Sequence, residues 1–326
     1  MPKLNRITRT AGALLVGAAL LAGCTKAAPA STTAPSAQDA KKDQPVQADP
    51  SLKPAVIASP EAPPRPPQGK TVEVRLTVEK RSLEVAPGWK REVWTYNGQV
   101  PGPTIRVNQG DTVKITLVNG DATSHSIDFH AARISPQAAF KSVDTGKDLT
   151  FEFKANDPGV FDYHCGTAPA LMHIANGMFG AIIVDPAEGR SPAREYVLVQ
   201  NEWYRDPMDL KDMEYGQPVA MAFNGIANQY VDKPLQARAG ERVRLYVANP
   251  GPNRFSAFHV VGTIFDRLEE DGNPKNAAYG VQTYTVPPGG ASLFETTIQE
   301  PGKYPVVTHS FADATLGALA VLEVTP

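Results

Sequence analysis

The sequence predicts an all-β protein made of two consecutive β-sandwich domains. Thirty Pro and 26 Gly residues among 326 favour short strands and many turns over helices. Runs with apolar residues at every second position, such as TVKITLV (112–118) and RVRLYV (242–247), are typical of half-buried strands. A pattern that recurs in the two halves of the chain indicates that one strand plan is used twice.

The overall composition is that of a globular protein without a strong charge bias. The chain has 32 basic and 34 acidic residues and a net charge of −2, so we expect no nucleic-acid partner. Its hydrophobic content of 42% suffices for one large core or two ordinary ones.

The N-terminus predicts an export signal over residues 1–23. Lys3, Arg6 and Arg9 precede the apolar run AGALLVGAALLAG, which is too short to span a bilayer as a mature helix. The run ends in LAGC, which resembles the bacterial lipobox, so we expect lipid on Cys24. An ordinary signal peptide with a chance cysteine is the alternative. Lipidation predicts an exported protein anchored to the cell envelope, at the outer membrane or a membrane facing the periplasm.

The segment that follows predicts a disordered tether over residues 24–68. Residues 25–68 contain ten prolines and no aromatic residue. Such a composition buries too little apolar surface to offset the entropy of ordering the chain.

From residue 69 the chain repeats, which predicts domains at 69–187 and 188–326. In this alignment Thr315 takes the place of Met178, and the second half has no cysteine. The matched pairs are TYNGQVPGPTIRVNQGDTVKITLVN (95–119) with AFNGIANQYVDKPLQARAGERVRLYVAN (222–249), DPGVFDYHC (157–165) with EPGKYPVVTH (300–309), and GMFGAIIV (177–184) with ATLGALAV (314–321).

Side-chain parity sorts the ligand-type residues of the first half into two groups. Cys165 has no disulfide partner if Cys24 carries lipid, so its place beside a histidine needs another explanation. Along extended chain, alternate side chains share a face. His125 therefore groups with Cys165, whereas Asp128 and His130 group with His164.

The first group predicts a blue-copper site. His173 and Met178 follow Cys165 in the spacing Cys-x7-His-x4-Met. Two imidazoles, a thiolate and a weak thioether form the ligand set of a blue-copper electron-transfer site. The alternative is a buried, inert cysteine among packing residues. The second group has only two histidines, which is incomplete for a copper or zinc site, and either His259 or His309 could supply a third ligand.

Several motifs resemble those of the NO-forming, copper-containing nitrite reductases with two cupredoxin domains. The resemblance covers residues 71–326 and rests on NGQVPGPTIRVNQGDTV, HSIDFHAA, YHC…MHIANGM, QNEWY, FHVVG and VVTHSF. It implies two Greek-key cupredoxin sandwiches. The short Cys-to-His loop resembles the subgroup that includes outer-membrane lipoproteins, which agrees with LAGC.

The resemblance also implies roles for individual residues. Asp128 and His259 match a pair that handles protons above the type 2 copper, and Val261 replaces the Ile that flanks the substrate in many members. The implied metal ligands are His125, Cys165, His173 and Met178 for a type 1 copper, and His130, His164 and His309 for a type 2 copper, with His309 coming from the neighbouring subunit of a homotrimer.

The implied reaction is reduction of nitrite to nitric oxide and water, with two coppers in each subunit. One electron would come from a cytochrome c or a small cupredoxin and pass from the type 1 to the type 2 copper. Two alternatives stay open. A two-domain multicopper oxidase needs a trinuclear cluster built from His-x-His pairs, and this chain has none. A tethered electron carrier with only the blue site would leave the second group of histidines without a role.

Overall fold

The structure, a computed structural model, describes residues 44–326, which form one compact unit. The predicted export signal, the lipidation site Cys24 and the first part of the predicted tether lie outside the described residues. Among the residues described, no helix is both long and apolar enough to cross a membrane.

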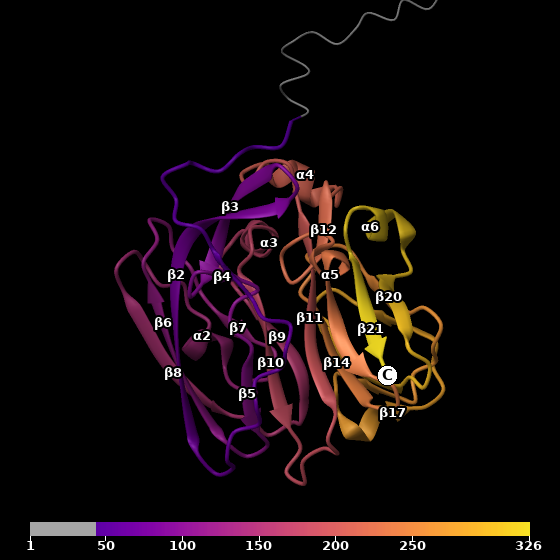
Figure 1. The fold of residues 1–326 in the computed structure, drawn as a ribbon. Coiled ribbons are helices and arrows are strands. Elements are labelled where there is room, and N and C mark those ends of the chain that lie inside the picture. Colours follow the sequence, from indigo (N-terminus) through magenta and orange to yellow (C-terminus); the bar gives the residue numbers. More distant parts are fainter. Residues whose placement is uncertain (1–43) are drawn as a thin grey trace, which may run out of the picture. The chain divides into compact units, whose positions relative to one another are not determined.

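The first part of this unit is a sandwich of two sheets with short helices in the connections (Figure 1). Buried and partly exposed side chains alternate along β6, as its sequence predicts. The sheet orders are β1-β4-β3-β2-β6-β8 and β5-β10-β9-β7. The elements are β1 (Val56–Ile57), β2 (Thr71–Ala86), β3 (Trp89–Tyr96), β4 (Gln99–Val100), β5 (Ile105–Asn108), β6 (Thr112–Asn119), β7 (Asp128–Phe129), α2 (Pro136–Ala139), β8 (Asp148–Lys154), β9 (Gly159–His164), α3 (Ala170–Ala175) and β10 (Phe179–Asp185).

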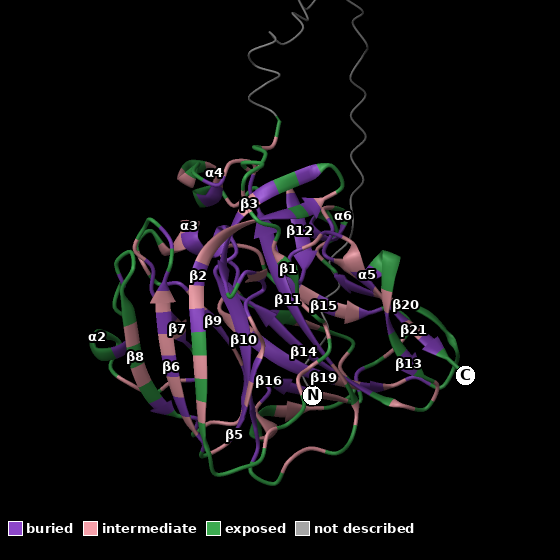
Figure 2. Ribbon diagram, turned by 60° about the vertical axis from the view of Figure 1, so that its left-hand side comes forward, coloured by how far each residue is buried: buried purple, intermediate pink, exposed green. Residues whose placement is uncertain are grey.

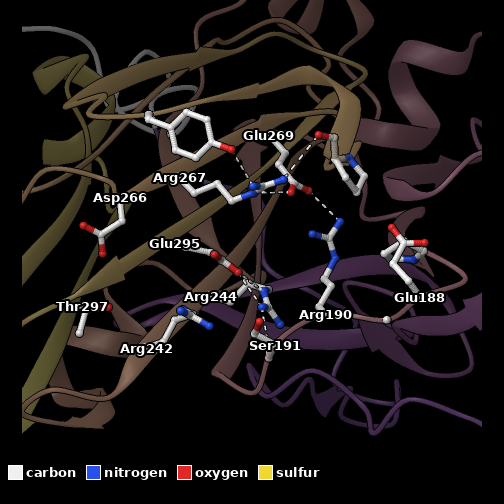
Figure 3. Close-up of a pocket in the computed structure, with 14 residues that line it drawn as sticks. Glu188, Arg190, Ser191, Arg242, Arg244, Asp266, Arg267, Glu269, Glu295 and Thr297 are labelled. Carbon is white, nitrogen blue, oxygen red and sulfur yellow. Dashed lines mark hydrogen bonds and ion pairs between the residues drawn. The ribbon is translucent and has the colours of Figure 1, made fainter.

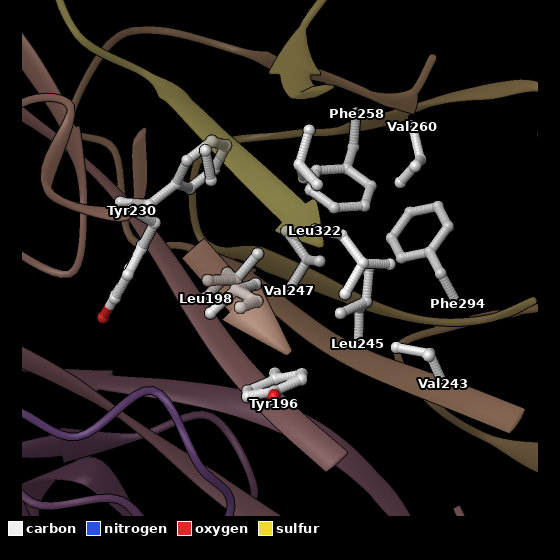
Figure 4. Close-up of a cluster of buried hydrophobic side chains, with 14 of the residues drawn as sticks. Tyr196, Leu198, Tyr230, Val243, Leu245, Val247, Phe258, Val260, Phe294 and Leu322 are labelled. Atoms are coloured by element: carbon white, nitrogen blue, oxygen red, sulfur yellow. The ribbon is translucent and has the colours of Figure 1, made fainter. Parts of the chain in front are cut away.

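The second part is another two-sheet sandwich. Its core gathers aromatic and aliphatic side chains from facing sheets, among them Phe258, Phe294 and Leu245 (Figure 4). The sheet orders are β12-β11-β14-β19-β16-β17 and β13-β21-β20-β15-β18. The elements are β11 (Arg194–Trp203), α4 (Leu210–Glu214), β12 (Ala220–Phe223), α5 (Gln229–Asp232), β13 (Lys233–Arg238), β14 (Arg242–Asn249), β15 (Ser256–Val260), β16 (Arg267–Glu270), the 3-10 helix η1 (Pro274–Asn276), β17 (Ala277–Ala278), β18 (Thr283–Val286), β19 (Gly290–Thr297), β20 (Gly302–Thr308), α6 (Phe311–Thr315) and β21 (Leu319–Thr325).

The two sandwiches share a buried apolar interface. Val160 and Ile183, on β9 and β10, belong to the same cluster as Val199, Tyr246 and Leu293 of the second sandwich. Every residue of β10 is buried, and the central strands form a continuous buried layer in Figure 2. The β9–β10 pair is therefore enclosed on both faces, which gives its side chains a rigid setting.

The prediction of a disordered tether is wrong for residues 44–68. The segment runs along strand edges of both sandwiches: β1 pairs in parallel with β4, and Val197 N donates to Pro60 O at 2.7 Å. Trp89 Nε1 also donates to Val46 O at 3.0 Å. The segment has little apolar surface of its own, but it completes edges that the sandwiches leave unpaired, so backbone hydrogen bonds order it. The prediction for residues 24–43 falls outside the described part of the chain.

The predicted equivalence of Thr315 and Met178 is also wrong. Phe179 pairs with His164, and Leu319 pairs with Val307 in the matching hairpin of the second sandwich. Gly177 and Gly317 precede these strands, with φ of 111° and 119°. Ala318 therefore takes the position of Met178. The sequence alignment pairs Gly180 with Gly317 and is therefore shifted relative to the alignment of the two backbones.

Candidate metal centres

The first group of ligand-type side chains lies inside the first sandwich. Cys165 Sγ is 3.2 Å from His173 Nδ1, which is 3.1 Å from His125 Nδ1. The three side chains are buried, and their ligand atoms all lie within 4.8 Å of one another. This is the grouping that side-chain parity and the Cys-to-His spacing predict.

Different elements supply these residues. Cys165 directly follows β9, His173 lies on α3, and His125 lies in the loop before β7, where its backbone forms a bridge with Val143. Met178 is fully buried; its N–H donates to His173 O at 3.2 Å, and its carbonyl accepts from Cys165 N at 3.0 Å. The backbone thus places Met178 directly beside Cys165 and His173, two of the other three predicted type 1 ligands.

The surroundings of Cys165 favour a thiolate. Burial raises the pKa of this thiol, but hydrogen bonds from His125 and His173 outweigh burial and lower the pKa to about 5. The backbone N–H of Ser126 donates to Sγ at 3.3 Å. A thiolate is the form of cysteine that binds metals.

A carboxylate that the sequence analysis missed lies behind His125. Asp121 Oδ2 is 2.9 Å from His125 Nε2 and accepts its hydrogen, which leaves Nδ1 free to face the thiolate. Burial raises the pKa of Asp121, but the hydrogen bonds from His125 and its neighbours hold it well below the usual range. The spacing of four residues was the available signal, because a ligating imidazole commonly donates its other N–H to a carboxylate.

The second group lies on the opposite face of β9. Phe161, Tyr163 and Cys165 contact the core of the first sandwich, whereas Val160 points to the interface between the sandwiches. His164 has the parity of Val160, so neighbouring residues carry the two groups to opposite faces. The second group joins His164 with His130 and Asp128, whose ligand atoms lie within 4.8 Å of one another.

The two imidazoles of this group point their Nε2 atoms at each other across 3.0 Å. His164 Nδ1–H donates to Cys165 O at 3.0 Å, and His130 Nδ1–H donates to Gly289 O at 3.0 Å. Each Nε2 is therefore a lone-pair acceptor in the neutral ring, and two facing acceptors need a proton or a metal ion between them. Burial lowers the pKa of His130, but Asp162 raises it to about 9, so copper would displace a proton there.

The second sandwich holds the remaining two histidines. The His259 and His309 rings have centroids 5.6 Å apart, and His309 also packs on Phe311. His259 Nδ1 lies 2.6 Å from Gln282 O. His309 is exposed and does not belong to the group of His130 and His164 within the described chain. Val261, the predicted substrate-flanking residue, is 42% exposed and lies two residues after His259.

Both groups fit copper. The first offers the thiolate and imidazoles that select this metal in electron-transfer sites. The second offers two imidazoles whose Nε2 atoms face each other, and an open side where a further ligand and a small anion have access.

A cavity away from both groups is lined by charged side chains. It measures about 500 Å³ and lies where the connection between the sandwiches meets the second sheet pair (Figure 3). Ion pairs line it, including Arg190 with Glu269 at 2.7 Å and Arg244 with Glu295 at 2.6 Å. It contains no histidine or cysteine, so it lacks the side chains for copper chemistry.

Comparison with known proteins also points to copper-binding relatives. A family model described as multicopper oxidase matches residues 77–189, the first sandwich. Copper-containing nitrite reductases are 39% identical in Neisseria gonorrhoeae, over 82% of this chain and 72% of that protein, and 32% identical in Rhizobium meliloti, over 78% and 76%.

Solved structures give the same result. The copper nitrite reductase of Nitrosomonas europaea matches with a TM-score of 0.76 and 41% identity, over 78% of this chain and 94% of that one. The enzyme of Thermus scotoductus SA-01 matches with a TM-score of 0.75 and 34% identity, over 79% and 62%. The predicted pair of cupredoxin sandwiches is thereby confirmed. The chain belongs to the family of copper-containing nitrite reductases, which are oxidoreductases.

Proposed function

We propose that this chain reduces nitrite to nitric oxide and water, with one electron passing from a type 1 to a type 2 copper. The observation that carries the proposal is the arrangement around β9. His164 and Cys165 are consecutive, and each belongs to a different ligand group. One peptide unit would therefore join the two metals by a short covalent path.

The type 1 copper would be held by residues of the first sandwich alone. His125, Cys165 and His173 supply the buried trigonal donors, and Met178 supplies the weak axial thioether. The closely packed, buried surroundings suit a site that exchanges electrons without binding substrate. A cytochrome c or a small cupredoxin is the proposed electron donor.

The type 2 copper would be shared between copies of the chain. His130 and His164 supply two imidazoles, and His309 of a second copy supplies the third. The exposure of His309 and its packing against Phe311, itself 56% exposed, support a contact of this kind. Three copies joined by such unlike contacts in a closed ring would form the proposed homotrimer, with two coppers per subunit.

The residues around the second group suit proton delivery. Copper, when bound, supplies one-electron reduction and a positive site for the nitrite anion. Conversion of nitrite to nitric oxide and water consumes one electron and two protons. Asp128 lies beside His130 and His164, where its carboxyl group would transfer a proton to the departing oxygen. His259 would hold the second proton, and Val261 would limit how nitrite lies.

The N-terminus would set the location of the enzyme. Export through residues 1–23 and lipid on Cys24 would anchor the protein to the cell envelope, at the outer membrane or a membrane that faces the periplasm. Radiolabelled fatty acid would be incorporated into the wild-type chain and not into Cys24→Ser.

The activity is tested by supplying nitrite and a small reductant to copper-loaded protein and measuring nitric oxide with an electrode. His309→Ala should retain the blue absorbance of the thiolate site, lose one of two coppers per subunit and stop producing nitric oxide. Continued production at the wild-type rate would contradict the type 2 assignment. Full loading with a single copper in the wild-type protein would favour an electron carrier instead.

A further inference from the structure

One buried carboxylate near the second group of histidines has no role in the function proposed above. Asp162 lies on β9, two residues before His164, so the two side chains share the strand face that points to the second sandwich. β7 pairs with β9 so that Asp128 is opposite His164 and Phe129 opposite Tyr163. His130 is next in this register, and its N–H donates to Asp162 O at 3.2 Å.

The cross-strand register brings the Asp162 carboxylate to the rear of the His130 ring. Asp162 Oδ1 lies 2.7 Å from His130 Nδ1, on the opposite side of the imidazole from the Nε2 that faces His164. Gly289 O, from the second sandwich, lies 3.0 Å from the same Nδ1. Gly289 O thus accepts the Nδ1–H, and the carboxylate of Asp162 places a negative charge against the same nitrogen. Both contacts favour the tautomer with its hydrogen on Nδ1, which leaves Nε2 facing His164.

Asp162 is itself poorly compensated. Its side chain is 1% exposed, and among the described residues neither carboxylate oxygen accepts a hydrogen bond; the ion-pair contact with His130 Nδ1 is the one partner. The adjoining cavity, about 340 Å³, adds Asp157 and Asp271 to the local negative charge, and its one arginine, Arg133, already pairs with Asp157. A buried carboxylate with a single weak partner costs free energy unless positive charge lies near it.

We propose that Asp162 is a positioning residue for the type 2 metal, acting through His130. Its negative charge beside Nδ1 favours the tautomer with a hydrogen on that atom, which Gly289 O accepts, and increases electron donation from Nε2 toward a bound cation. A metal ion at Nε2 supplies the positive charge that the buried carboxylate lacks. This inference rests on the proposed role of His130 as a type 2 copper ligand.

The test is a copper titration of the full chain after copper removal, with a competing chelator. Affinity is followed through the electron paramagnetic resonance signal of the type 2 copper, and the blue absorbance of the type 1 site reports an intact fold. Asp162→Asn keeps an acceptor without the charge and should weaken type 2 binding by about 10-fold; Asp162→Val keeps neither and should weaken it by about 100-fold. Both variants should also alter the hyperfine splitting of the type 2 signal.

The matched control is Asp157→Asn, which changes a carboxylate of the same cavity that pairs with Arg133 instead of His130. It should bind copper as the wild type does. Wild-type copper affinity and splitting in folded Asp162→Val would overturn the inference, even if that variant unfolds at a lower temperature. His130→Ala separates the two claims. If it retains the second copper, the ligand assignment fails; if it loses that copper while the Asp162 variants bind normally, only the role of Asp162 fails.

Discussion

The two sandwiches share a backbone plan but differ at every position that would bind metal. The backbone N–H of Met178 donates to His173 O, and that of Ala318 donates to Asp313 O, so Asp313 takes the place of His173. The equivalent positions in the second sandwich are Ser256 for His125, Val307 for His164, Thr308 for Cys165, Asp313 for His173 and Ala318 for Met178.

The second sandwich fills the corresponding space with an ion pair. Arg254 Nη2 lies 2.7 Å from Asp313 Oδ1. The backbone carbonyl of Arg254 accepts a hydrogen bond from the Asn249 side chain. Thr123 O accepts the same hydrogen bond from Asn119 in the first sandwich. The fold therefore provides a place for a buried polar cluster, and the side chains decide whether that cluster binds a metal or neutralises itself. Metal binding is therefore determined by the side chains at these positions and not by the sandwich fold.

The largest effect should come from removing the cysteine, a residue type that the second sandwich lacks. Cys165→Ser should abolish the blue absorbance and lower donor-driven nitrite reduction by more than about 100-fold, beyond the usual loss for a residue that merely supports a ligand. Absorbance spectra and nitric oxide production measure both. Thr308→Ser, at the equivalent position, keeps the hydroxyl that accepts from Ala257 N and should change neither.

Asp128 and His259 hold equivalent positions in the two sandwiches. Asp128 is opposite His164, as His259 is opposite Val307. Asp128→Asn should lower kcat by about 100-fold, since a general acid contributes at least this much, while both coppers remain bound. A variant with wild-type kcat at every pH would show that Asp128 transfers no proton.

Stability should depend on the ion pairs that join the sandwiches. Glu195 of the second sandwich lies 2.6 Å from Arg106 of the first and also contacts Arg244. Glu195→Gln should lower the free energy of unfolding by about 2 kcal/mol, less than the ~3–5 kcal/mol for a fully broken buried pair, because each arginine keeps a second carboxylate. Denaturant unfolding measures the change, and an unchanged midpoint would contradict it.

The same glutamate predicts how stability varies with pH. Burial raises the pKa of Glu195, but hydrogen bonds from Arg106 and Arg244 outweigh it and hold the pKa below its usual value. The ionised form is thus favoured in the folded state, so its contribution is present above the unfolded pKa of about 4.3 and is lost as the pH falls through the folded pKa. Glu195→Gln should flatten this acid-side loss.

The smallest effect should follow from adding a thiol to the second sandwich. Thr308→Cys places it where the first sandwich has Cys165, but Ser256 and Asp313 offer no imidazole beside it. We expect no second blue absorbance and the same copper content per subunit. A new blue band would mean that the sandwich backbone alone specifies the metal.

The sequence predicted more of the ligand groups than of their supports. Parity along the segments that contain β7 and β9 placed His125 with Cys165, and His130 with His164, because alternation of side chains along extended backbone depends little on context. Asp121 and Asp162 were missed because the search weighed histidine and cysteine, although the same parity places Asp162 beside His164. The tether was predicted from composition, which does not reveal that existing strand edges bind residues 44–68.

The proposed role of His309 as a copper ligand depends on a second copy of the chain, and mixing two variants, each expected to be inactive, tests it. His130→Ala lacks one side of the proposed shared site, and His309→Ala lacks the other. Each variant alone should bind only the type 1 copper and produce no nitric oxide. In trimers assembled from both, the contact between His130 of one copy and His309 of the next is intact in about a quarter of the sites on random mixing. Co-assembled protein should regain nitrite reduction in that proportion. If verified mixed trimers of the two variants produce no nitric oxide, the site is not shared between copies.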